Sequence, residues 1–421
     1  MRFRPLLIRL TALCCGFLLQ TMSAHAAPKH ILLRSAWQVI NIGDIGHTPG
    51  ILRLLQEQIP DAEVTLWPGQ SIHGPVEEML RRNFPKLRIV STPEEVAQAF
   101  KECDFLLHSS GSGLVAKDSL AKWSKETGKP YGVYGISLPG AYAETLPVLD
   151  AETRDILTRS RFVFFRDSVS LQYAKDNGVA SPVMDFAPDA AFGVALRNDA
   201  AADKFLAENH LQPGKYLCVI PRLRFTPMWE IHHRPMNDGS RQREAVNNAL
   251  KEHDNAPLRE AVIAVARQTD LKVLLCPEDE SQMAVGKEMI FDKLPDDVKA
   301  KVVWREHFWL TDEAVSTYVK SAGLLSLEMH SPILCIANVV PAIVCRFKQQ
   351  TTKGFMWRDI GLKEWLFDMD KPDEVTQIVP TTLALVTDPA AAKQKTAKAQ
   401  AFIQQRQRET MKILETVLNQ P

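Results

Sequence analysis

Short continuous apolar runs recur along the chain and alternate with segments whose apolar residues have helical spacing. The runs at residues 30–37, 162–165 and 216–220 are typical of strands that are buried on both faces. After the first run, the apolar residues between Ile51 and Ile59 lie on one face of a helix. This alternation predicts an α/β fold built on parallel, doubly wound sheets.

The alternating pattern occurs twice, which predicts two domains. An alanine-rich segment ending at Pro213-Gly214 separates an N-terminal domain, residues 29–200, from a C-terminal domain, residues 213–375. An amphipathic helix at residues 385–421 can cross back to the N-terminal domain. The polar segment 225–255 is predicted to be a long binding loop, followed by a helix from 257 to 269.

Residues 1–26 have the pattern of a signal peptide. Three arginines precede the apolar run 10–20, and Ala24-His25-Ala26 offers a small-residue cleavage site. We therefore expect export to the periplasm or beyond, with no stable membrane span after cleavage. An uncleaved N-terminal anchor is the alternative, although the run is short for a span.

The composition excludes some classes of protein. The chain has 421 residues, of which 45% are hydrophobic and 24% charged, and Lys plus Arg equals Asp plus Glu at 50 each. A soluble globular chain without affinity for nucleic acid is expected. His232 and His233 have no third ligand at metal spacing, so the sequence predicts no metal site and no cofactor.

His330 is the first candidate for chemistry because it interrupts the apolar segment 324–347. The segment reads as strand, turn, helix and strand, which places His330 at a carboxyl strand end, where parallel sheets bind ligands. Arg346 and Lys348 follow the next strand. A core histidine that caps a turn is the alternative interpretation.

A glycine-bearing turn follows the first strand. Asn41, Gly43, Asp44 and His47 lie where a helix begins, so backbone N–H groups, a base and a proton donor could meet a ligand there. Helix capping by Asn41 and Asp44 is the alternative.

Two further strand ends carry candidate residues. Ser110 and Gly111 would allow a strand end to approach a ligand closely, or would simply form a flexible loop. Arg222 and Arg224 follow the first strand of the second domain and could bind an anion, or form a solvated surface pair.

The order of these strand-end motifs resembles the polysaccharide pyruvyl transferase family. The resemblance rests on residues 41–44, 109–113, 165–170, 185–192 and 326–341, and it covers roughly residues 30–367. It implies two Rossmann-like domains that face each other across a cleft, as in GT-B glycosyltransferases.

The resemblance also implies an activity, in which the enolpyruvyl unit of phosphoenolpyruvate is transferred to two hydroxyls of a saccharide acceptor as a pyruvate ketal. His330 would be the general acid, and Arg222, or failing it Arg224, would hold the donor, with Arg346 and Lys348 as further cations. The acceptor or cleft residues would be Asn41, Gly43, Asp44, His47, Ser110, Gly111 and Glu328.

Glu328 departs from the family pattern, which has arginine two residues before the histidine. A carboxylate there would repel phosphoenolpyruvate unless Arg346 or Lys348 compensates. Phosphoenolpyruvate is also a cytoplasmic metabolite, whereas the signal peptide predicts export. Two alternatives therefore stay open: a GT-B-type glycosyltransferase, and an exported saccharide-binding protein with a degenerate site.

Overall fold

The computed structural model describes residues 28–72, 74–138 and 148–420. The predicted signal peptide, residues 1–26, lies outside these ranges, so export stays a prediction. Among the described helices, none combines the length and the apolar character that a membrane span requires.

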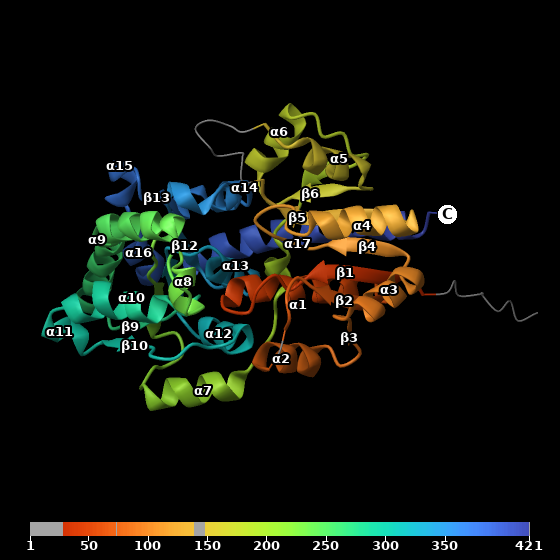
Figure 1. Cartoon of the computed structure of the whole chain (residues 1–421). Coiled ribbons are helices and arrows are strands. Elements are labelled where there is room, and N and C mark those ends of the chain that lie inside the picture. The colour runs from red at the N-terminus through yellow and green to blue at the C-terminus, as the bar shows by residue number, and fades with distance from the viewer. Residues whose placement is uncertain (1–27, 73, 139–147, 421) are drawn as a thin grey trace, which may run out of the picture.

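The N-terminal half forms a seven-stranded parallel sheet (Figure 1). Its strand order, β3-β2-β1-β4-β5-β6-β7, is the doubly wound order. Strands β1 to β3 are added toward one edge of the sheet, and strands β4 to β7 are added from β1 toward the other edge. The strands are β1 (His30–Ser35), β2 (Glu63–Pro68), β3 (Arg88–Ile89), β4 (Phe105–His108), β5 (Tyr131–Ile136), β6 (Val163–Phe165) and β7 (Met184–Phe186). The connecting helices are α1 (Ile42–Gln58), α2 (Pro75–Asn83), α3 (Pro93–Glu102), α4 (Lys117–Thr127), α5 (Ala151–Arg159) and α6 (Ser168–Asp176), and the 3₁₀ helix η2 (Ala190–Gly193) follows β7.

The C-terminal half repeats this architecture with six parallel strands in the order β10-β9-β8-β11-β12-β13. The strands are β8 (Tyr216–Ile220), β9 (Lys272–Leu275), β10 (Val302–Trp304), β11 (Gly323–Ser326), β12 (Ala342–Arg346) and β13 (Leu366–Asp368). The main helices are α7 (Asp199–Glu208), α8 (Met228–Ile231), α9 (Asp238–Gln268), α10 (Gln282–Met289), α11 (Asp296–Lys299), α12 (Thr311–Tyr318), α13 (His330–Ala337), α14 (Met356–Asp359), α15 (Pro372–Val375), α16 (Ile378–Thr387) and α17 (Pro389–Leu418). The prediction of two Rossmann-like α/β sheets is confirmed.

The two sheets meet through loops at the carboxyl ends of their strands. The loop after β1 contacts the loop after β9, where the Ile42 N–H donates to the carbonyl of Glu278 at 2.9 Å. Residues Asn41 and Asp279 also form an isolated antiparallel bridge. Because parallel sheets bind ligands at these ends, the contact region is the expected position of a ligand site.

Helix α17 joins the two halves. In Figure 1 it runs from the C-terminal half toward the strands of the N-terminal half. Arg406 of α17 donates to the carbonyl of Phe186 at 2.7 Å, and the Tyr134 and Thr410 hydroxyls are 3.3 Å apart. α17 also packs against α1 and α13.

The prediction of a long loop at residues 225–255 is wrong. Most of this segment belongs to α9, a helix of 31 residues that passes through Pro257. Its buried polar residues hold the loop after β8: Asn247 bonds the backbone N–H and C=O of Phe225, and Asn255 donates to the Arg222 carbonyl. This part of α9 is buried through amide side chains that form tertiary hydrogen bonds, so its sequence lacks the apolar stripe that predicts a helix.

Candidate functional site

Asn41 fixes the start of α1 at the domain interface. Its side-chain oxygen accepts from the backbone N–H groups of Gly43, at 2.8 Å, and Asp44, at 3.1 Å, which is an ordinary N-cap. Its amide nitrogen donates to Glu278 Oε1 at 3.3 Å across the interface. The capping interpretation of Asn41 is therefore correct, and the cap also ties α1 to the second domain.

His330 begins α13 and lies directly against Gly43. A Cβ at position 43 would be 1.9 Å from the His330 Cβ, so only glycine fits there. The His330 side chain is 3% exposed, and its backbone neighbour Ser331 donates its N–H to Glu278 Oε2 at 2.5 Å. The start of α1 and the start of α13 therefore share one tightly packed contact.

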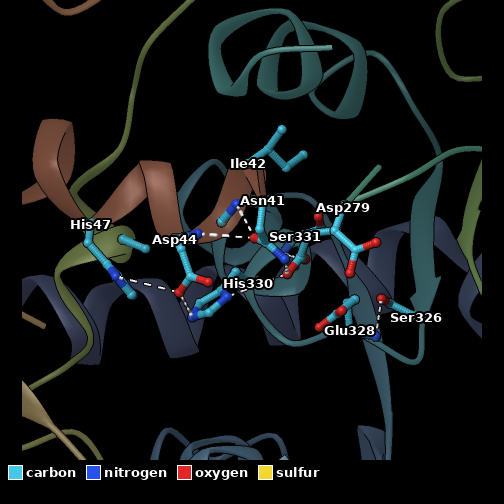
Figure 2. A network of polar contacts seen from close by, with 12 residues as sticks. Asn41, Ile42, Asp44, His47, Asp279, Ser326, Glu328, His330 and Ser331 are labelled. Carbon is cyan, nitrogen blue, oxygen red and sulfur yellow. Dashed lines mark hydrogen bonds and ion pairs between the residues drawn. The ribbon is translucent and has the colours of Figure 1, made fainter. Parts of the chain in front are cut away.

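Asp44 lies between two buried histidines. Its Oδ1 is 3.8 Å from His330 Nε2 and 3.9 Å from His47 Nδ1, and the two imidazole rings meet edge to face with centroids 4.9 Å apart. Figure 2 shows both rings directed toward the Asp44 carboxylate. The sequence predicted Asp44 and His47 as cleft residues and His330 as catalytic, and the structure brings all three together.

Each histidine has a second carboxylate on its other side. His330 Nδ1 is 3.4 Å from Glu278 Oε1, and His47 Nε2 is 3.3 Å from Asp189 Oδ1. Asp189 is fully buried and also pairs with Arg166 at 2.6 Å.

Burial and charge set the protonation of this cluster. Burial, followed by the nearby charge of Lys353, lowers the pKa of His330 well below its usual value. Burial alone would raise the pKa of Asp44, but His330, His47 and Lys353 together lower it. In this arrangement Asp44 is therefore ionised and His330 is neutral near pH 7.

A small pocket of about 90 Å³ opens beside Asp44, between the two domains. Its walls are Gln38, Ile40, Asn41 and Asp44 from the N-terminal domain and Arg222, Thr226, Met228, Asp279, Glu328 and Lys353 from the C-terminal domain. His330 touches Asp44 but is not part of this lining. The volume is below the 300 Å³ or so of ordinary ligand pockets, so a ligand of that size would need the two domains to separate.

Glu328 is paired with the arginine that was predicted to hold the donor. Arg222 Nη1 lies 2.7 Å from Glu328 Oε2, and Gln282 donates to the other carboxylate oxygen at 2.8 Å. Burial raises the pKa of Glu328 to about 7, and Arg222 opposes that shift. The negative charge of Glu328, which departs from the family pattern, is therefore compensated by Arg222 and not by Arg346 or Lys348.

The other predicted anion-binding residues lie elsewhere. Arg224 forms two hydrogen bonds with Asp254, at 2.8 and 2.9 Å. Arg346 is buried and pairs with Asp368 at 2.6 Å. Neither arginine lines the pocket, nor does Lys348. A role in anion binding remains a prediction for all three residues. The arrangement favours Arg222 as the anion-binding residue, because Arg222 lines the pocket.

Ser110 and Gly111 stabilise the first sheet. Ser110 Oγ accepts the backbone N–H of Ala190 at 2.8 Å, and the Gly111 carbonyl accepts that of Ser137 at 3.1 Å. Both residues are buried and lie outside the pocket lining. They hold η2 and β5 in place behind the histidine cluster.

Sequence reasoning did not assign Glu278, Asp189, Gln38 or Lys353 to this site, and it also missed the pocket residues Ile40, Thr226, Met228 and Asp279. Glu278 follows β9 in an acidic run, and Asp189 follows β7. Both therefore lie after a strand end, which is the same signal that identified His330 as a candidate. Lys353 carried no signal, because nothing in its local sequence places it at the interface.

Two doubly wound parallel sheets, joined at their strand-end loops and bridged by a C-terminal helix, define a two-domain GT-B-type fold. Solved structures of this class resemble the chain in fold. Anabaena HepE in complex with UDP-glucose has a TM-score of 0.53 at 12% identity, covering 92% of this chain and 99% of that chain. The S. aureus MnaA–UDP structure has a TM-score of 0.52 at 11% identity, with 87% and 90% covered. The kitacinnamycin glycosyltransferase has a TM-score of 0.54 at 12% identity, with 93% and 100% covered.

A sequence comparison identifies the family of the chain. The model of the polysaccharide pyruvyl transferase family matches residues 41–348, and the chain belongs to this family. None of the curated proteins compared with the chain matches it. The matched region begins at Asn41 and includes Asp44, His47 and His330, so the interface cluster lies within the family domain.

Proposed function

We propose that this protein transfers a pyruvyl group from phosphoenolpyruvate to a saccharide of the cell envelope or of an exported polysaccharide. Membership of the polysaccharide pyruvyl transferase family carries the proposal, together with the position of His330 at the facing strand ends of the two domains. The family match does not favour the two alternatives, glycosyl transfer and saccharide binding without turnover.

The proposed reaction has two bond-forming steps. A sugar hydroxyl adds to C2 of phosphoenolpyruvate and gives up its proton to a base, while an acid protonates the methylene carbon to form a methyl group. A second hydroxyl then adds to C2 and loses its proton as the C2–O bond to phosphate breaks. The products are one cyclic pyruvate ketal and inorganic phosphate.

The residues suit this chemistry in different ways. His330 is neutral when the pocket is empty, and a phosphoenolpyruvate anion beside it would favour the protonated form that an acid needs. Glu278 lies at its Nδ1 and can hold the ring while Nε2 faces Asp44. Arg222 and Lys353 are the cations that line the pocket, and they would contact the donor's carboxylate and phosphate.

The test is an assay of the purified mature chain with phosphoenolpyruvate and a panel of envelope glycans. We expect equal amounts of phosphate and glycan-bound ketal, and we expect His330→Gln to abolish both. His232→Gln, at an exposed histidine, is the matched control and should keep full activity. Release of nucleotide from a sugar nucleotide, with no ketal from any acceptor, would instead support a glycosyltransferase.

We also propose that the reaction takes place outside the cytoplasm, because residues 1–26 have the pattern of a signal peptide. The mature N-terminus should then lie after Ala26. N-terminal sequencing of the protein from the periplasmic fraction tests this, and recovery of intact Met1 in the cytoplasm contradicts it.

A further inference from the structure

Asp44, His47 and His330 present three ligand atoms toward one point. The carboxylate oxygen of Asp44 and the facing imidazole nitrogens all lie within 4.8 Å of one another. We propose that these three side chains bind a single divalent transition-metal ion, with zinc as the best match. The prediction of no metal site considered His232 and His233, and sequence spacing could not show that His330 meets Asp44 and His47.

The three ligand atoms lie somewhat farther apart than coordination requires. Ligands about 2.1 Å from a tetrahedral zinc ion lie about 3.4 Å apart. Asp44 Oδ1 is 3.8 Å from His330 Nε2 and 3.9 Å from His47 Nδ1, and all three ligand atoms lie within 4.8 Å of one another. Rotation of the Asp44 carboxylate and the two rings toward a common point would complete the coordination.

The imidazole nitrogens that face Asp44 are free to bind an ion. The side chains of His47 and His330 are 1% and 3% exposed, yet His47 Nδ1 and His330 Nε2 have no hydrogen-bond partner among the described residues. Buried polar atoms are normally satisfied, so two unpartnered nitrogens in one cluster need an explanation. An ion bound between the rings supplies it for the two that face Asp44.

The remaining two nitrogens face the groups that support metal-binding histidines. Asp189 lies 3.3 Å from His47 Nε2, and Glu278 lies 3.4 Å from His330 Nδ1. A carboxylate on the outer nitrogen fixes the ring orientation and makes the inner nitrogen a better donor. Both histidines of the cluster have this arrangement, which a purely structural pair would not require.

The donor set selects the class of ion. Two imidazoles and one carboxylate favour zinc and similar transition metals over Mg²⁺ or Ca²⁺, which take oxygen ligands. Three protein ligands leave a coordination position open, and Asp44 borders the interface pocket. Lys353 and Arg222 also line this pocket and oppose a cation, while Glu328 and Asp279 favour it.

Bound metal would regulate the proposed reaction. When His330 Nε2 coordinates the ion it cannot carry a proton, so the metal-bound chain cannot use His330 as an acid. This regulatory role rests on the proposed function, whereas metal binding itself does not. Zinc should therefore inhibit pyruvyl transfer, and a chelator should restore it.

The experiment measures binding directly. The untagged mature chain, stripped with chelator, is titrated with zinc chloride by calorimetry, and its metal content is measured by mass spectrometry after dialysis. We expect one ion per chain with a Kd of about 1 µM or below. His47→Gln and Asp44→Asn should each weaken binding about a hundredfold or more, while His232→Gln should not change it.

Each outcome decides the proposal. No zinc binding below about 100 µM, or tight binding that both ligand variants retain, would overturn it. Should His47→Gln fail to fold, Asp44→Asn and the visible absorption of the cobalt-loaded wild-type chain still test the coordination. Tight zinc binding in a chain that makes no ketal would leave the metal site standing and count only against the proposed function.

Discussion

Gly43 shows how a single residue holds the two domains together. The helix that carries Asp44 and His47 reaches His330 only because position 43 has no side chain, since a Cβ there would lie 1.9 Å from the His330 Cβ. Gly46, one turn later, is different: a Cβ there would make an ordinary contact of 3.5 Å with Leu334.

The two glycines therefore make a matched pair of substitutions. Gly43→Ala should lower the free energy of unfolding by about 1–3 kcal/mol, the usual cost of overpacking, and should reduce activity by separating Asp44 from His330. Gly46→Ala should be neutral or stabilise by up to about 1 kcal/mol, because alanine favours helix. Urea unfolding of both variants measures this, and equal stability of the two would contradict the close contact.

The Glu328–Arg222 pair gives a prediction about donor affinity. Glu328→Gln removes the negative charge 2.7 Å from Arg222 and leaves the guanidinium free to bind phosphoenolpyruvate. We expect the Kd for phosphoenolpyruvate, measured by calorimetry, to fall about tenfold, which corresponds to about 1.4 kcal/mol. Glu313→Gln is the control, because it removes an ion pair with Arg305 that lies outside the pocket lining, and it should leave the Kd unchanged. Weaker donor binding in Glu328→Gln would show that the carboxylate is needed.

At the scale of the elements, β4 contains a histidine that makes stability depend on pH. His108 is fully buried, and burial lowers its pKa to about 3. In the unfolded chain its pKa is about 6.5, so between these values the unfolded state binds the proton and the folded state does not. The free energy of unfolding must therefore fall as the pH falls through this window.

His108→Gln should remove this contribution. The difference in unfolding free energy between wild type and variant should change by about 1.4 kcal/mol per pH unit between about pH 4 and 6. His307→Gln, at an exposed position, should leave the pH dependence as in the wild type. Parallel pH profiles for wild type and His108→Gln would mean that His108 is protonated in the folded protein.

Helix α17 is the element that most directly links the domains. Met411 and Leu414 are fully buried on its inner face, whereas Lys412 is exposed. Met411→Ala should lower the free energy of unfolding by about 2–5 kcal/mol, as for other large-to-small core changes, and Lys412→Ala should have little effect. Guanidinium unfolding monitored by tryptophan fluorescence measures both. A neutral Met411→Ala would mean that α17 is loosely docked.

The elements also show which parts of the fold the sequence could predict. Buried parallel strands are continuous apolar runs, so β1, β8 and β11 were recognisable, and the strand-end rule led to His330. The part of helix α9 before Pro257 was missed because Asp254 and Asn255 are buried through tertiary hydrogen bonds and not through apolar contact. Local patterns cannot report such contacts.

The sequence also could not predict which charged residues pair with each other. Arg222 and Glu328 are 106 positions apart, and only the assembled second sheet brings them together. The sequence identified Asp44, Arg222 and Glu328 as site residues but could not show that Arg222, Arg224 and Arg346 each face a carboxylate. It also could not place Glu278 and Asp189 behind the histidines.

For the whole molecule, the site belongs to neither domain alone. Asp44 and His47 come from the first domain and His330 and Glu278 from the second, and a pocket of about 90 Å³ is too small for a glycan. Turnover should therefore require the domains to open and close around the acceptor. The domain limits, residues 29–200 and 213–375, stay predictions that limited proteolysis can test.

The proposed reaction requires the interface to transfer a proton to the donor's methylene carbon as the ketal forms. The most direct measurement is NMR of the product made from phosphoenolpyruvate and an accepted glycan in D₂O. We expect the wild-type chain to give a ketal methyl group that carries a single deuterium, and His330→Gln to give no product. Free pyruvate without ketal, or undiminished ketal formation by His330→Gln, would contradict the proposed reaction.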